Sequence, residues 1–275
     1  MRHVNIMKTD CRCVSAGAPA LVGADELGTP EDKSFVAASD GSTQKYVQML
    51  PANAANQITD VLIALHGHGS DRWQYVRDDR GECKAARDFA AAHGMIYISP
   101  DYRATTSWMG PAAEADLVQL IAALQREHKV RRVFLTGGSM GGTSVLILAA
   151  LHPELVAGVS SLNGTANMLE YTGFQDAIAA SYGGDKQQKA GEYRMRSPEL
   201  APKKFTMPVA FAVGGKDITV PPDSVRRLAG KLKEKDARNV LLLDRQDGGH
   251  ETTYADTLET LEFVRKAADA QEKQP

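Results

Sequence analysis

The sequence predicts a single α/β domain with a doubly wound, mostly parallel sheet. Six short runs along the chain are apolar nearly throughout, as expected of strands buried on both faces of a parallel sheet. Stretches of helical length with one apolar face separate these runs. This alternation favours a doubly wound fold, because consecutive parallel strands must be joined by crossover helices.

The elements can be placed in order along the chain. Two short strands are expected first, with Asp40-Gly41 as the turn between them. The expected strands are 35–39, 44–50, 60–65, 95–99, 132–136, 156–160, 208–213 and 239–243. The expected helices are 82–93, 112–127, 141–152, 223–235 and 254–268. In the second of these helices, Leu117, Leu120, Ile121 and Leu124 fall on one face.

Residues 1–33 show no sustained period, and we interpret them as an N-terminal arm. Residues 34–272 then form the single domain. One connection, 165–205, is far longer than ordinary connections between a helix and a strand. Such an insertion is either a lid over a binding site or a solvated helical cover on one edge, and both interpretations stay open.

The composition excludes several classes of protein. The 275 residues are 43% hydrophobic and 24% charged, which is enough to bury a core without disulfides or metals. With 32 basic and 34 acidic residues, the chain has no electrostatic reason to seek nucleic acid or an anionic membrane. The longest apolar run, 145–151, is shorter than a membrane span of about 20 residues. No secretory signal is visible, and the cysteines (Cys11, Cys13 and Cys83) form no disulfide framework, so we expect a cytoplasmic protein.

A candidate nucleophile lies between an expected strand and an expected helix. Gly137-Gly138-Ser139-Met140-Gly141 fits the pattern Gly-x-Ser-x-Gly. In that pattern the serine occupies a strained turn that exposes its Oγ, and the flanking glycines avoid clashes with strand and helix. A phosphate-binding loop would need Lys and then Ser or Thr after the second glycine, and these are missing. Ser139 is therefore the predicted nucleophile.

A serine hydroxyl needs a base and an orienting acid. Of the seven histidines, His66, His68 and His250 follow strands at the edge where open α/β sheets bind ligands. His250 lies in the loop after the last strand, from which a base can reach Ser139. Asp217 follows another strand and is the predicted acid. The rivals are Asp223, which caps a helix, and Asp244 and Asp247, which belong to the same loop as His250.

Five segments together resemble the esterase and prolyl-oligopeptidase-like branch of the α/β-hydrolase superfamily. They are Leu-His-Gly-His-Gly at 65–69, Gly-Gly-Ser-Met-Gly-Gly at 137–142, Arg-Ser-Pro-Glu at 196–199, the run 213–222 and Gly-His at 249–250. The resemblance covers about residues 45–268 and implies a serine hydrolase without a cofactor or metal. It also implies an oxyanion hole formed by the backbone N–H groups of Met140 and His68. His66 would then brace the loop.

The substrate is less well defined than the chemistry. We expect His66, Trp108, Asn163 and Tyr182 to line the substrate pocket. A carboxylic ester is the first expectation, because peptidases of this branch usually carry a large N-terminal domain and only about forty residues precede the first strands here. An acylated sugar is one such ester, and the oligomeric state is open.

Three alternatives remain at the level of sequence. A small peptidase of the same branch is the first, and a hydrolase fold kept as a non-catalytic binding module is the second. The third is a dinuclear metallohydrolase, because His66-Gly-His68-Gly-Ser-Asp71 is close to the His-x-His-x-Asp-His pattern of such enzymes.

Overall fold

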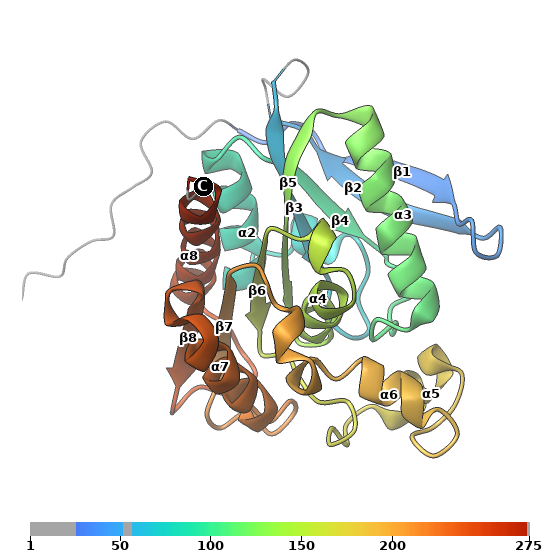
Figure 1. Cartoon of the computed structure of the whole chain (residues 1–275). Helices are drawn as coiled ribbons and strands as arrows, with labels where there is room; N and C mark the ends of the chain where they lie inside the picture. The colour runs from blue at the N-terminus through green and yellow to red at the C-terminus, as the bar shows by residue number, and fades with distance from the viewer. Residues whose placement is uncertain (1–25, 52–56, 274–275) are drawn as a thin grey trace, which may run out of the picture.

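An eight-stranded sheet forms the centre of the protein in the computed structural model, which describes residues 26–51 and 57–273 (Figure 1). The strand order is β1-β2-β4-β3-β5-β6-β7-β8. β1 and β2 pair antiparallel, β2 is antiparallel to β4, and all later pairings are parallel. The strands are β1 Glu31–Val36, β2 Thr43–Met49, β3 Thr59–Leu65, β4 Ile96–Pro100, β5 Val130–Gly138, β6 Gly158–Leu162, β7 Val209–Gly214 and β8 Val240–Arg245.

Helices cover both faces of the sheet, and each face has its own hydrophobic core. α3, α4 and α7 pack on one face, whereas α2 and α8 pack side by side on the other (Figure 1). The helices are α1 Gln74–Arg77, α2 Gly81–Ala92, α3 Pro111–Glu127, α4 Met140–Leu151, α5 Gln175–Tyr182, α6 Ala190–Met195, α7 Asp223–Asp236 and α8 Tyr254–Glu272. The short 3₁₀ helices are η1 Pro153–Leu155, η2 Pro198–Leu200, η3 Pro202–Lys204 and η4 Ala237–Asn239. This arrangement is the expected α/β-hydrolase fold.

The first strand is the main departure from the expected elements. It covers Glu31–Val36 instead of 35–39, so residues 31–33 of the expected arm belong to the sheet. The turn instead covers residues 38–40, and its Asp40 accepts hydrogen bonds from the N–H and hydroxyl of Ser42. β1 is a charged edge strand, and Lys33 pairs with Glu127 at 3.2 Å. Such a strand lacks the apolar pattern on which the sequence prediction depends.

Two further expectations fall partly on residues that the structure does not describe. The first 25 residues of the arm, including Cys11 and Cys13, lie outside the described residues. Cys83 is buried in α2. Among the helices that the structure describes, none combines the length and apolar character required to cross a membrane.

The insertion at 165–205 folds into α5, α6, η2 and η3 beside the ends of α3 and α7 (Figure 1). Glu199 in η2 ties its last part to α7. The buried Glu199 carboxylate accepts hydrogen bonds from Arg227 at 2.7 Å, from Lys231 at 3.3 Å and from the Asn167 amide at 2.9 Å. The hydrogen bond from Arg227 is the main reason that the pKa of Glu199 falls to about 2. That the insertion moves as a lid stays a prediction.

Replacing Glu199 with Gln removes this buried charge and weakens the hydrogen bonds from its three partners. We expect a loss of about 2 kcal/mol, since hydrogen bonds to charged groups contribute on the order of 1.5–3 kcal/mol. In a domain of this size that lowers the melting temperature by about 4–8 °C at neutral pH. Because the folded-state pKa is depressed, the wild-type advantage exists above the ordinary pKa of 4.5 and is lost as the pH falls toward 2.

Calorimetry across this pH range measures the effect. The matched control is Glu170→Gln, which removes an exposed carboxylate that contacts the same Arg227 and is expected to shift the melting temperature little. Equal melting temperatures for Glu199→Gln and wild type at neutral pH would contradict the anchoring role.

Candidate active site

Three predicted site residues meet at the carboxyl edge of the sheet. Ser139 follows β5, Asp217 follows β7 and His250 follows β8. Because β5 to β8 run parallel, their carboxyl ends lie along the same edge. Residues more than a hundred positions apart in the sequence are brought into contact in this way.

Ser139 lies in a strained turn between β5 and α4. Its φ is 57° and its ψ is −118°, a backbone conformation that side-chain-bearing residues rarely adopt. Its N–H donates to the carbonyl of Leu162 at 2.8 Å. The turn brings α4 so close to β3 that a Cβ on Gly141 would lie 2.0 Å from the carbonyl oxygen of Leu65. The glycine at 141 is therefore required by the close approach of two backbones.

A continuous chain of hydrogen bonds joins the three side chains. His250 Nε2 lies 2.9 Å from Ser139 Oγ, and His250 Nδ1 lies 2.7 Å from Asp217 Oδ2. The other oxygen of Asp217 accepts from the N–H groups of Thr219 and Val220, each at 2.9 Å. The two backbone bonds fix the carboxylate of this buried residue, which in turn fixes the imidazole.

The rival acids have other partners. Asp244 binds the guanidinium of Arg226 at 2.8 and 2.9 Å. Asp247 is exposed to solvent and pairs with Lys216 at 2.7 Å. Asp223, at the start of α7, is also exposed. Asp217 is the carboxylate that the structure brings to His250.

The loop after β3 lines the same pocket as the serine. Within the described part of the chain, neither the N–H of His68 nor that of Met140 donates to a protein acceptor. The loop itself is braced on both sides. The N–H of Gly67 donates to Gln74 Oε1 at 2.7 Å, and the hydroxyl of Tyr102 donates to the His66 carbonyl at 2.7 Å.

The two histidines of this loop have structural partners of their own. The His66 ring is buried, with its nitrogens 2.8 Å from the Gly67 carbonyl oxygen and 3.1 Å from that of Asp101. The Trp108 indole N–H donates to His68 Nδ1 at 3.0 Å. Burial lowers the pKa of both imidazoles, which favours their neutral forms.

Asp71, the third residue of the metallohydrolase-like pattern, also has a hydrogen-bond partner within the protein. Asp71 accepts the N–H of Trp73 at 2.8 Å. The three side chains of that pattern therefore point to separate partners within the protein.

A pocket of about 350 Å³ opens onto Ser139 and His250. It is lined by Gly67, His68, Gln74, Arg80, Glu82, Gly138, Ser139, Asn163, Phe174, Thr219 and His250. Asn163 is one of these lining residues, held by hydrogen bonds with Thr252 and with the N–H of Gly214.

The expectation that His66, Trp108 and Tyr182 also line this pocket is wrong. All three side chains are buried behind its wall, and the Tyr182 hydroxyl donates to the Trp108 carbonyl at 3.1 Å. The direction in which each of these side chains points depends on tertiary packing. His66 keeps the bracing role that the resemblance implies.

Four lining residues were not anticipated. Phe174 comes from the insertion and stacks near His68, with ring centroids 4.2 Å apart. Gln74 belongs to α1, a single helical turn too short to give a period. Arg80 and Glu82 lie at the start of α2, where the preference for an acidic first turn offers an ordinary explanation for a glutamate. No sequence signal distinguishes such residues from surface residues.

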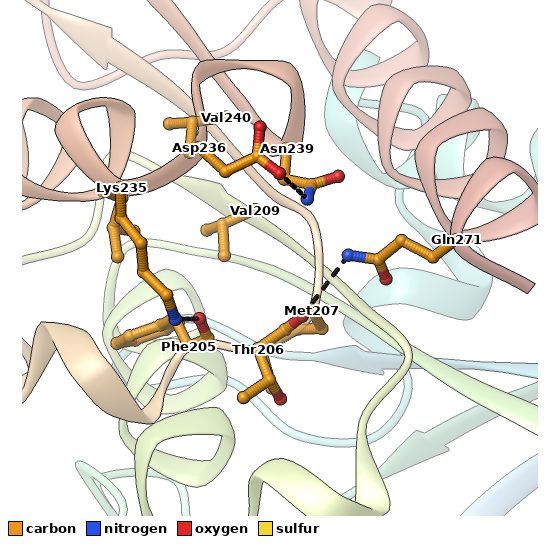
Figure 2. A pocket seen from close by; sticks show the side chains of 10 residues that line it. Phe205, Thr206, Met207, Val209, Lys235, Asp236, Asn239, Val240 and Gln271 are labelled. Carbon is orange, nitrogen blue, oxygen red and sulfur yellow. Dashed lines mark hydrogen bonds between the residues drawn. The ribbon is translucent and has the colours of Figure 1, made fainter. Parts of the chain in front are cut away.

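A second pocket, of about 270 Å³, lies at the opposite edge of the sheet (Figure 2). Val209 and Val240 line it at the first positions of β7 and β8. Its polar side chains are satisfied locally: Lys235 donates to the Phe205 carbonyl, and Gln271 donates to the Thr206 carbonyl. Its described lining offers no nucleophile with an adjacent base, so the chemistry belongs to the carboxyl edge.

Solved structures share this fold. Puromycin hydrolase aligns with a TM-score of 0.71 and 17% identity, over 94% of this chain and 41% of its own. A dipeptidyl aminopeptidase IV-like protein from Bacteroides ovatus ATCC 8483 aligns with a TM-score of 0.67 and 18% identity, over 89% and 36%. S-formylglutathione hydrolase from Staphylococcus aureus aligns with a TM-score of 0.63 and 13% identity, over 87% and 98%.

The chain thus spans less than half of the first two proteins and nearly all of the third. At these identities the likeness demonstrates the shared fold. No curated protein matches the sequence. The family comparison is more specific, because residues 84–270, more than half of the chain, match the prolyl oligopeptidase family. This match extends from α2 to α8 and includes Ser139, Asp217 and His250. The protein therefore belongs to the prolyl oligopeptidase family and has the α/β-hydrolase fold.

Proposed function

We propose that the protein is a carboxylic ester hydrolase that acts through an acyl-enzyme on Ser139. The observation that carries the proposal is the unbroken hydrogen-bond chain from Ser139 Oγ through His250 to Asp217, which opens into a pocket. The unused N–H groups of Met140 and His68 beside the serine support it. Together these groups supply a nucleophile, a base, an orienting carboxylate and donors for an oxyanion.

In the first half of the reaction, Ser139 Oγ attacks the ester carbonyl carbon while His250 Nε2 takes the hydroxyl proton. The carbonyl oxygen becomes an oxyanion and accepts hydrogen bonds from the N–H groups of Met140 and His68. The bond to the alcohol oxygen then breaks, and the alcohol leaves with the proton from His250. Asp217 stabilises the imidazolium that forms in between. The acyl group is now bound to Ser139.

Water completes the cycle by the same route. His250 takes a proton from a water molecule, whose oxygen attacks the acyl carbon. The second oxyanion occupies the same two N–H groups. Its collapse breaks the bond to Ser139 Oγ, which recovers its proton from His250, and the carboxylic acid is released. The reaction uses one ester and one water and requires no cofactor.

A small ester fits the pocket better than an extended peptide. The pocket volume of about 350 Å³ lies at the lower end of the range for small-molecule sites. The exposed ring of Phe174 packs beside His68 and bounds the space on one side. We therefore favour a compact acyl group and alcohol, of which an acylated sugar is one example.

A peptidase is the second candidate, and the family match is the observation that favours it. A peptide bond would be cleaved by the same residues, because the acyl-enzyme is common to both reactions. The binding-module alternative has less support, since such a module has no need for three aligned side chains at 2.7 and 2.9 Å.

Labelling with a fluorophosphonate tests the nucleophile without assuming a substrate. We expect a single adduct on Ser139 by intact mass and peptide mapping, because His250 activates that hydroxyl. Ser139→Ala should give no adduct and melt at nearly the wild-type temperature. Heat-unfolded wild type is a second control and should not react. An adduct on another serine, or none on the folded protein, would reject the assignment.

Removing the charge of Asp217 tests the orienting role. In Asp217→Asn the side chain keeps its size but no longer stabilises the imidazolium, so kcat for a phenyl ester should fall by about 10³–10⁴-fold. The matched control is Asp247→Asn, which removes an exposed carboxylate three residues from His250. It should retain its kcat. Similar losses in both variants would show that loop charge, and not this hydrogen bond, governs the rate.

A matched ester and amide distinguish the two candidate functions. Phenyl butyrate and butyranilide share an acyl group and a ring, and differ in the bond that is broken. We expect turnover of the ester and no measurable turnover of the anilide. Comparable kcat/KM values for the two would favour the peptidase. Ser139→Ala serves as the blank for both assays.

A further inference from the structure

Glu82 places a carboxylate in the pocket directly beside the nucleophile. It lies in the first turn of α2 and lines the same pocket as Ser139 and His250. Its Oε2 would be 3.0 Å from a Cβ built on Gly138, the residue that precedes the serine. A Cβ at position 138 would therefore press against the Glu82 carboxylate. A group bound at Ser139 is therefore within reach of Glu82.

The Glu82 carboxylate has no hydrogen-bond donor within the described residues. Its side chain is only 14% exposed, and its one ion contact there is Arg80, at 3.8 Å. Arg80 is engaged elsewhere: its Nε donates to Asp78 at 2.7 Å, and its side chain is 54% exposed. A poorly hydrated carboxylate without a donor costs free energy, and such groups concentrate at functional sites.

The charges around the pocket favour a cation as the missing partner. Glu82 is the carboxylate among the lining residues, and the lining guanidinium, Arg80, is paired with Asp78. Burial raises the pKa of Glu82, whereas Arg80 and His250 oppose that rise. A bound ammonium group would also lower the pKa of Glu82, and it would donate the hydrogen bond that the carboxylate lacks.

We infer that Glu82 is a specificity-determining residue that binds a protonated amino group of the substrate. This inference rests on the proposed function and narrows it to esters that carry a cationic amine in the acyl or the alcohol part. A charge-assisted hydrogen bond between the ammonium and Glu82 would hold the ester carbonyl against Ser139.

Two pairs of esters of equal shape test the inference on each side of the ester bond. For the alcohol, 2-(dimethylamino)ethyl acetate is compared with 3-methylbutyl acetate. For the acyl group, phenyl 4-(dimethylamino)butanoate is compared with phenyl 5-methylhexanoate. Rates are followed by pH-stat at neutral pH, where the amines are protonated. In wild type we expect the amine to have the higher kcat/KM in one pair, by about tenfold or more.

The variants then connect that preference to the carboxylate. Glu82→Gln should lower the amine-to-neutral ratio of kcat/KM by about tenfold or more, whereas Glu82→Asp, which keeps the charge, should retain part of it. The matched control is Asp79→Asn, which removes a carboxylate that is 93% exposed and outside the pocket. Its ratio should equal that of wild type.

Several outcomes would overturn the inference. These are a wild-type ratio near one in both pairs, an unchanged ratio in Glu82→Gln, or an equal fall in Asp79→Asn. A gain of equal size with 3-hydroxybutyl acetate would show that a neutral donor suffices. Fluorophosphonate labelling of wild-type Ser139 separates the two levels of the argument. A labelled enzyme without amine preference contradicts this inference alone, whereas an unlabelled enzyme contradicts the proposed function.

Discussion

The whole site depends on one close approach between backbones at the end of β5. Ser139 can project into the pocket only because the chain reverses within a few residues and α4 begins almost against β3. The reversal holds Ser139 at a φ of 57°, which costs on the order of 1–3 kcal/mol. The hydrogen bond from the Ser139 N–H to Leu162 and the buried packing of α4 compensate for that strain. A strained residue is therefore held by a helix that is buried along nearly its whole length.

The candidate catalytic residues lie at one edge of the sheet only. Six parallel strands aim their carboxyl ends at the same side, so that short loops suffice to bring the serine, the carboxylate and the imidazole together. Each loop is then fixed by backbone bonds of its own, as when the N–H groups of Thr219 and Val220 hold Asp217. The pocket at the opposite edge has no such convergence, although it is of similar size. Cavity volume alone therefore does not identify the functional edge.

The sequence predicted what depends on local pattern and missed what depends on packing. β3 to β8 were recognisable because they are apolar on both faces, and the glycines around Ser139 mark a turn that few other residues allow. β1 was misplaced because a charged edge strand has no apolar period. Trp108 was expected in the pocket because it follows a strand at the carboxyl edge, and Tyr182 because it lies in the insertion, yet both are buried. Whether a side chain faces a cavity depends on neighbours that are distant in sequence.

Gly138 and Glu82 show how the two kinds of information combine. From the sequence, the glycine before Ser139 belongs to the Gly-x-Ser-x-Gly pattern, and the glutamate belongs to the start of a helix. In the structure the two residues are neighbours, because the Glu82 carboxylate lies 3.0 Å from the position that a Cβ at 138 would take. A solvated carboxylate at the start of a helix does not need to lie against the turn that holds Ser139. A carboxylate that is held against the nucleophile turn, partly buried and without a donor is costly to the fold, and a cationic substrate group would offset that cost when it binds.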